Sequence, residues 1–259
     1  MKKIFIKNKS GEKLAGILHE ADSDKLVIVC HGRLTTKDDY FLPELCEAIS
    51  CIGINAFRFD FAGNGESEGK FEDSTITKAI EDLKCAVDHF QTNFDILSLI
   101  GHSMGGVIVL LHQVKYSSAK SVVDIAGVVN QREYLLSKYS DMVIRQINSQ
   151  RFVIQEHNGK KIVLSKKYLD DRASYGDISK KARMIKVPVL IVHGKNDEDI
   201  PYNNALVMKN AILANDLISI DGAGHFFEKT EHKMKLMDSI ISWINSKKKH
   251  LYTKNNSSA

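Results

Sequence analysis

Apolar and polar positions follow strand-like and helix-like periods in turn along the chain. Residues 3–8 and 13–20 alternate between apolar and polar positions and predict an antiparallel hairpin at the start of the chain. Strand-length runs rich in apolar residues follow at 26–30, 54–59, 96–100, 121–126, 187–192 and 217–220. Helical spacing predicts helices at about 43–51, 75–90, 106–116, 203–213 and 231–245. This alternation predicts an α/β fold with a doubly wound, mostly parallel sheet.

One stretch of the chain, residues 130–186, interrupts this alternation. Apolar residues recur there at helical spacing, at Leu135, Tyr139, Met142, Val143 and Ile147. Two further segments, 152–157 and 160–165, flank Asn158-Gly159, which predicts a two-residue hairpin turn. We expect a lid of helices and a hairpin inserted over the sheet, and the alternative is a peripheral structural subdomain. The predicted division is a core of residues 1–129 and 187–247, a lid of residues 130–186 and a polar tail of residues 248–259.

The charge balance bears on the class of partner. The 259 residues carry a formal net charge of +4, and much of it lies in the lysines at 247–249. There is no basic stripe with interleaved aromatic residues, so no nucleic-acid partner is expected. Hydrophobic content of 43% is typical of a globular protein.

The cysteines and the absence of targeting patterns indicate in which cellular compartment the protein is expected. The four cysteines lack C-x-x-C spacing and are interpreted as buried, reduced thiols. The start of the chain has no apolar secretory core, and no apolar stretch approaches the length of a membrane span. We therefore expect a cytoplasmic protein without stable membrane insertion. The oligomeric state cannot be predicted from this pattern.

The pentapeptide G-H-S-M-G at residues 101–105 stands between a predicted strand and a predicted helix. This order of strand, G-x-S-x-G and helix is that of a nucleophile elbow. The turn is so sharp that Ser103 must adopt a strained backbone, and a glycine two residues away on each side avoids a clash. Backbone N–H groups at the start of the helix would favour a developing oxyanion. Ser103 is therefore the candidate nucleophile.

An acid and a histidine follow this serine in the order that serine hydrolases of this type use. Asp197 lies in the loop after the predicted strand 187–192, and His225 lies just past the next strand. Asp199 in the same loop and Asp124 after an earlier strand compete for the role of the acid. We favour Asp197 with His225 because of their chain order and loop positions.

His102 is the nearest rival to His225, but as the chain neighbour of Ser103 its ring is expected to point away from the serine hydroxyl. Two backbone N–H groups should form an oxyanion hole, and we assign them to Met104 and to Arg33 in the loop after the strand 26–30. The side chain of Arg33 could instead gate the pocket or attract an acidic substrate. No sequence pattern indicates a metal site or a cofactor.

Several stretches together resemble the α/β-hydrolase superfamily, and within it intracellular serine carboxylesterases of the cinnamoyl/feruloyl-esterase type. The matching stretches are 31–33, 57–69, 101–106, 193–194 with Asp197 and Pro201, and 224–225. The resemblance implies a catalytic triad of Ser103, Asp197 and His225, with Arg33 and Met104 as oxyanion donors. Arg33 itself departs from the pattern, since relatives often carry an aromatic or other apolar residue there.

These observations lead to an expected activity. We expect a serine hydrolase that cleaves a small-molecule carboxylic ester through an acyl-enzyme intermediate. The same groups cleave thioesters and lipid esters, so an acyl thioesterase or a monoacylglycerol lipase is the alternative. A non-catalytic binding protein on the same fold is a third hypothesis.

Overall fold

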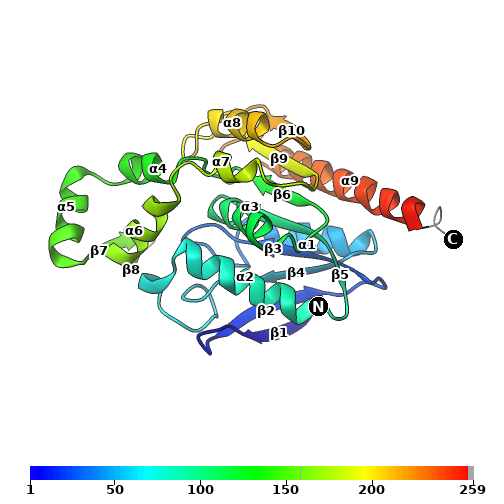
Figure 1. Ribbon diagram of the computed structural model, residues 1–259, viewed down its shortest axis with the longest axis horizontal. Coiled ribbons are helices and arrows are strands. Elements are labelled where there is room, and N and C mark those ends of the chain that lie inside the picture. The colour runs from blue at the N-terminus through cyan, green and yellow to red at the C-terminus, as the bar shows by residue number, and fades with distance from the viewer. Residues whose placement is uncertain (158, 256–259) are drawn as a thin grey trace.

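The computed structural model describes residues 1–157 and 159–255. Within these residues, eight strands form one sheet in the order β1-β2-β4-β3-β5-β6-β9-β10. β1, β2 and β4 pair antiparallel, and the remaining neighbours pair parallel. The predicted α/β fold with a mostly parallel sheet is therefore confirmed (Figure 1). The strands are β1 (Lys2–Lys7), β2 (Lys13–His19), β3 (Lys25–Cys30), β4 (Asn55–Phe59), β5 (Asp95–His102), β6 (Val122–Ile125), β9 (Val189–Gly194) and β10 (Asn215–Ile220).

Helices cover both faces of this sheet. α2, α3 and α8 pack on one face, while α1 and α9 pack on the other. Both faces are apolar and need covering, as strand β3 illustrates. Leu26 and Ile28 face one cluster of buried side chains, and Val27 and Val29 face the other. The helices of this core are α1 (Leu42–Cys51), the 3-10 turn η1 (Phe71–Asp73), α2 (Ile76–Phe90), α3 (Met104–Tyr116), α7 (Ser179–Ala182), α8 (Asn203–Ala211) and α9 (Thr230–Asn255).

The strand order places the site. From β3 the chain crosses to β4 on one side and then returns to β5 on the other side of β3. This reversal makes a crevice at the carboxyl ends of β3 and β5, where ligands of open α/β sheets bind. The loop after β3 carries Gly32 and Arg33, and β5 leads directly to Ser103.

Element ends differ from the predictions by a few residues. The strand expected at 187–192 begins at Val189, because Pro188 has no N–H to donate to a sheet. The last helix, expected to end near 245, extends to Asn255 into the predicted polar tail, and residues 256–259 lie outside the described residues. None of the described helices is long and apolar enough to cross a bilayer. The expectation that all four cysteines are buried is wrong for Cys51, which is exposed at the end of α1, and for Cys85, which is only half-buried.

A separate lobe of helices and a hairpin lies beside the sheet, as Figure 1 shows in green. Its own small apolar cluster includes Leu135, Ile147 and Leu164, whereas Ile178 and Ala182 belong to the main core. The lid boundaries of 130–186 stay a prediction. The hairpin strands match the expected segments, but Asn158 of the predicted turn lies outside the described residues. The lobe comprises α4 (Gln131–Lys138), α5 (Asp141–Gln150), β7 (Phe152–His157), β8 (Lys160–Ser165) and α6 (Lys166–Tyr175).

The apolar stripe predicted in this segment does not form one helical face. The helix ends at Lys138, Tyr139 is extended, and the side chain of Ser140 caps a new helix by accepting from the N–H of Val143. Leu135, Tyr139 and Ile147 are buried inside the lobe, but Met142 is 76% exposed. The stripe therefore packs within the lobe, apart from Met142, whose side chain is largely exposed.

Candidate active site

The backbone at Ser103 has the strained geometry expected of an elbow. Ser103 has φ 56° and ψ −115°, between the end of β5 and the start of α3. A Cβ added at Gly101 would lie 2.1 Å from the carbonyl oxygen of Gly105, and one added at Gly105 would lie 2.5 Å from the carbonyl oxygen of Cys30. Both glycines are required because backbone, which cannot rotate aside, occupies the space. The turn presents the Ser103 hydroxyl at the carboxyl edge of the sheet.

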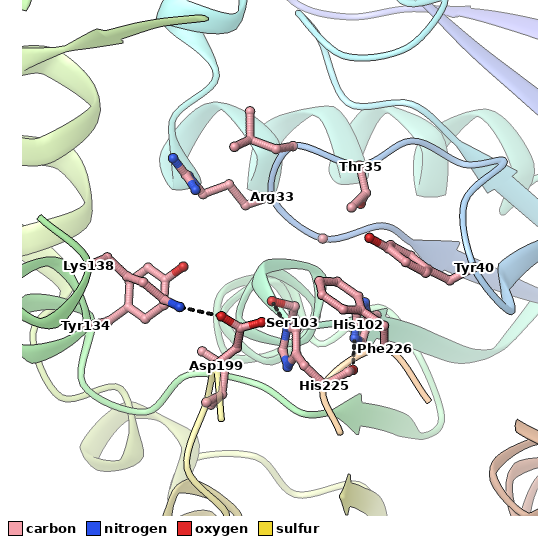
Figure 2. Close-up of a pocket in the computed structure, with 13 residues that line it drawn as sticks. Arg33, Thr35, Tyr40, His102, Ser103, Tyr134, Lys138, Asp199, His225 and Phe226 are labelled. Carbon is pink, nitrogen blue, oxygen red and sulfur yellow. Dashed lines mark hydrogen bonds and ion pairs between the residues drawn. The ribbon is translucent and has the colours of Figure 1, made fainter. Parts of the chain in front are cut away.

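Ser103 is the first member of a hydrogen-bonded chain of three side chains. Its Oγ lies 3.0 Å from Nε2 of His225, in the loop between β10 and α9 (Figure 2). The other ring nitrogen of His225, Nδ1, lies 2.7 Å from Oδ2 of Asp197, in the loop after β9. Three loops at one edge of the sheet thus bring together the serine, histidine and acid that the sequence singled out.

The carboxylate of Asp197 is fixed from several directions. Its Oδ1 accepts hydrogen bonds from the N–H groups of Asp199 at 3.0 Å and Ile200 at 2.7 Å. Nε2 of His193 lies 3.3 Å from Oδ2. Burial alone would raise the pKa of Asp197, but hydrogen bonds from His193 and His225 outweigh it and hold the pKa below its usual range. Asp197 is therefore ionised and oriented toward Nδ1 of His225.

The competing acids lie in other surroundings. Asp199 is at the surface, where Oδ1 pairs with Nζ of Lys138 at 2.5 Å. Asp124, at the carboxyl end of β6, is only 2% exposed, and burial raises its pKa to about 7. Within the described residues, neither carboxylate has a hydrogen bond to His225. Of the three acids, Asp197 is the one hydrogen-bonded to His225 among the described residues.

His102 has a contact that the sequence reasoning missed. Its ring lies against that of His225, with centroids 4.9 Å apart, and its Nε2 lies 2.9 Å from the carbonyl oxygen of His225. Burial lowers the pKa of His102 to about 3, so the ring is neutral at pH 7 and Nε2–H donates to that carbonyl. His102 therefore supports the backbone of His225, and no hydrogen bond joins it to Ser103 in the described part of the chain.

The expected oxyanion donors lie on either side of Ser103. Met104 is the first residue of α3, where N–H groups have no partner inside the helix. The loop carrying Arg33 approaches from β3, since a Cβ added at Gly32 would lie 3.2 Å from Cβ of Ser103. Among residues 1–157 and 159–255, the N–H groups of Arg33 and Met104 donate no hydrogen bond. Both are thus available to an oxygen of a bound carbonyl.

A cavity of about 370 Å³ opens over this arrangement. Figure 2 shows Arg33, Tyr134 and Lys138 on one side of Ser103, and Tyr40 and Phe226 on the other. The lining residues are Gly32, Arg33, Leu34, Thr35, Tyr40, His102, Ser103, Tyr134, Lys138, Asp199, Ile200, His225 and Phe226. None of the five stripe residues is among them, so the stripe does not line this cavity.

Seven of the lining residues went unnoticed in the sequence: Leu34, Thr35, Tyr40, Tyr134, Lys138, Ile200 and Phe226. Tyr134 and Lys138 are one helical turn apart on α4, which places them on one face, but nothing local shows which way that face points. Phe226 stacks on Tyr40 with ring centroids 4.3 Å apart, and its place directly after His225 was an available signal. In the described part of the chain, no group of three or more His, Cys, Asp or Glu side chains is placed to hold a metal ion.

Comparisons with known proteins identify the family of the chain. A family model described as serine aminopeptidase, S33 (Hydrolase_4) matches residues 21–177. The chain is 21% identical over 199 residues to the mitochondrial palmitoyl-protein thioesterase ABHD10 of Pongo abelii, which covers 75% of this chain and 61% of that protein. The chain thus spans about three fifths of the length of that relative.

Solved structures share the fold. Est1E from Butyrivibrio proteoclasticus, determined with ferulic acid bound, superposes with a TM-score of 0.78 at 22% identity, over 94% of this chain and 98% of Est1E. The monoacylglycerol lipase of Paleococcus ferrophilus superposes with a TM-score of 0.75 at 18% identity, over 90% and 99% of the two chains. Because the family model covers more than half of its length and the fold agrees, the chain belongs to the serine aminopeptidase S33 (Hydrolase_4) family of α/β-hydrolases.

Proposed function

We propose that this protein is a serine hydrolase that cleaves small-molecule carboxylic esters through an acyl-enzyme intermediate. The observation that carries the proposal is the chain of hydrogen bonds from Ser103 through His225 to Asp197, open to a cavity. In this arrangement Asp197 holds the proton of His225 on Nδ1, so that Nε2 is free to act as a base. The histidine then faces the serine hydroxyl in the tautomer that general-base catalysis needs.

The reaction follows from these positions. Nε2 of His225 takes the proton of Ser103 as Oγ attacks the ester carbonyl, and the N–H groups of Arg33 and Met104 stabilise the oxyanion that forms. The imidazolium returns its proton to the leaving alcohol, and the acyl group stays on Oγ. Water, activated by the same nitrogen, then hydrolyses the acyl-enzyme and regenerates the serine.

Thioester and lipid-ester hydrolysis use the same steps and stay the alternative activities. The name of the ABHD10 relative favours a thioester substrate, and that of the Paleococcus ferrophilus structure favours a lipid ester. Both names describe those proteins, and they suggest which substrates to test first. The expected cytoplasmic location also stays a prediction, since the ABHD10 relative is named as mitochondrial.

The test is the reactivity of Ser103. A fluorophosphonate probe should label the wild-type protein at Ser103, and p-nitrophenyl esters and acyl-CoA thioesters of graded chain length should be hydrolysed. The substitution Ser103→Ala should abolish labelling and lower kcat by about 10⁶, the loss found when a triad nucleophile is removed. Ser137→Ala is the matched control, because this exposed serine of α4 lies outside the hydrogen-bonded chain.

Two outcomes would refute the proposal. One is turnover at the wild-type rate by a correctly folded Ser103→Ala protein, which would exclude the serine mechanism. The other is a folded wild-type protein that neither reacts with the probe nor hydrolyses any ester or thioester, which would favour the non-catalytic binding protein.

A further inference from the structure

The lobe beside the cavity contains an arginine that is wholly buried. Arg172 of α6 has no exposed surface and is among the largest fully buried side chains of the described residues. Its Nη1 donates to the hydroxyl of Tyr168 at 3.0 Å, and its guanidinium lies 4.2 Å from the ring centroid of Tyr134. Nε and Nη2 have no hydrogen-bond partner in the described part of the chain. Tyr134 lines the cavity and Arg172 does not, so the ring of Tyr134 separates the charge of Arg172 from the cavity.

A second arginine reaches the same cluster of tyrosines from the core. Arg33 is among the residues that line the cavity, and its Nη2 donates to the hydroxyl of Tyr139 at 2.6 Å. Its guanidinium carbon lies 5.8 Å from the ring centroids of both Tyr139 and Tyr168. Its Nε is buried and has no hydrogen-bond partner among the described residues. Two guanidinium groups thus share one set of tyrosines.

Within residues 1–157 and 159–255, neither guanidinium forms an ion pair with a carboxylate. The carboxylate that lines the cavity, Asp199, is already paired with Lys138. Burial would raise the pKa of Tyr168, but the charges of Arg172 and Arg33 outweigh it and lower the pKa of this phenol. A buried cation costs free energy unless an anion pairs with it. Because no carboxylate of the described residues pairs with these two arginines, we expect the negative charge to come from a bound molecule.

We propose that Arg33, backed by Arg172 and the surrounding tyrosines, binds a carboxylate carried by the substrate. The proposal rests on the proposed function. It narrows the substrates to esters or thioesters that carry a carboxylate on the acyl or alcohol group that extends toward α4. An arginine fork binds a carboxylate with two parallel N–H donors, which fixes both position and orientation. The N–H of Arg33 is also an expected oxyanion donor, so one residue would contact both the carboxylate and the reacting carbonyl.

The first experiment compares charged with neutral substrates of one shape. On the acyl side, p-nitrophenyl hydrogen glutarate is compared with p-nitrophenyl methyl glutarate. On the alcohol side, 4-acetoxybenzoate is compared with its methyl ester, each rate being divided by the rate in buffer alone. The wild-type protein should favour the charged member of at least one pair by roughly 10-fold to 100-fold in kcat/KM, the range for a hydrogen bond to a charged group.

Variants assign this preference to a residue. Arg33→Met keeps the backbone N–H and side-chain volume but removes the charge, so the ratio of charged to neutral substrate should fall by roughly 10-fold to 100-fold. Arg33→Lys should retain part of the ratio, because it keeps the charge but loses the fork. Arg132→Met is the matched control, since this exposed arginine of α4 does not line the cavity, and it should leave the ratio unchanged.

A binding measurement keeps the proposal testable without turnover. Titration calorimetry should show glutarate binding to the wild-type protein more tightly than dimethyl glutarate, and Arg33→Met should remove the difference. Wild-type preference for the neutral member of both pairs, or equal binding of glutarate and its diester, would overturn the carboxylate site. Ser103-dependent hydrolysis of neutral esters without such a preference would overturn this inference and leave the proposed function standing.

Discussion

The contact between Asp197 and His225 gives the sharpest prediction about the proposed reaction. The amide of Asp197→Asn would have nearly the same shape, but its NH₂ would donate to Nδ1 of His225 across the 2.7 Å contact. The ring proton would then move to Nε2, which faces Ser103 at 3.0 Å, and the base would be lost. Such a change of tautomer lowers kcat by about 10⁴ in serine proteases, equivalent to about 5.5 kcal/mol of transition-state stabilisation.

The assay is single-substrate kinetics on p-nitrophenyl butyrate, with titration of the active serine by a fluorophosphonate. Asp199→Asn is the control. Like Asp197→Asn it removes one negative charge from this loop, but the side chain of Asp199 pairs with Lys138, whereas that of Asp197 pairs with His225. We expect kcat of Asp199→Asn to stay within tenfold of wild type. If Asp199→Asn were the severe variant, or Asp197→Asn kept more than a tenth of wild-type kcat while folded, the acid would be wrongly assigned.

Two further predictions concern stability. The pKa of Asp124 is about 7 in the folded protein and about 4 in an unfolded chain, so the folded state alone holds its proton between these values. The contribution of Asp124 to the free energy of unfolding therefore falls as pH rises from about 4 to about 7. Thermal melts across this range should show Asp124→Asn gaining stability relative to wild type with rising pH, and a constant difference would contradict the burial argument. Ile147→Ala should cost about 2–5 kcal/mol because the side chain is fully buried, whereas the exposed Met142→Ala should stay within about 0.5 kcal/mol. Neither should alter the chain-length preference on p-nitrophenyl esters, since neither residue lines the cavity, and a shifted preference in Met142→Ala would show that the lobe moves over the site.

The positions that local rules control could be predicted from the sequence. Sharp turns require glycine, and Gly101 and Gly105 therefore revealed the elbow before any contact was known. The loops with Asp197 and His225 follow apolar strands, and parallel strands bring the loops at their carboxyl ends to one edge of the sheet. Chain order then selected these two side chains from several acids and histidines.

The rest of the site depends on how the lobe packs against the core. The spacing of apolar residues along the chain does not predict that packing. Helical spacing runs unbroken from Leu135 to Ile147, so it hid the break at Tyr139. Ser140 followed by Asp141 was an available signal, because serine with an acid in the first turn marks a helix start. Nothing comparable marked Arg172, since a charged residue on a polar helix is ordinarily exposed.

Arg33 connects the core and the lobe. Its proposed role therefore depends on its side chain as well as on its backbone N–H. Its N–H belongs to the core loop beside Ser103, while its side chain enters the lobe and donates to Tyr139. A carboxylate bound by the guanidinium would place the ester carbonyl relative to an N–H of the same residue, so binding energy would orient the reacting group. An aromatic residue at this position would keep the oxyanion donor and lose that orientation. Arg33, whose side chain the resemblance did not lead us to expect, is thus the residue proposed to select the substrate.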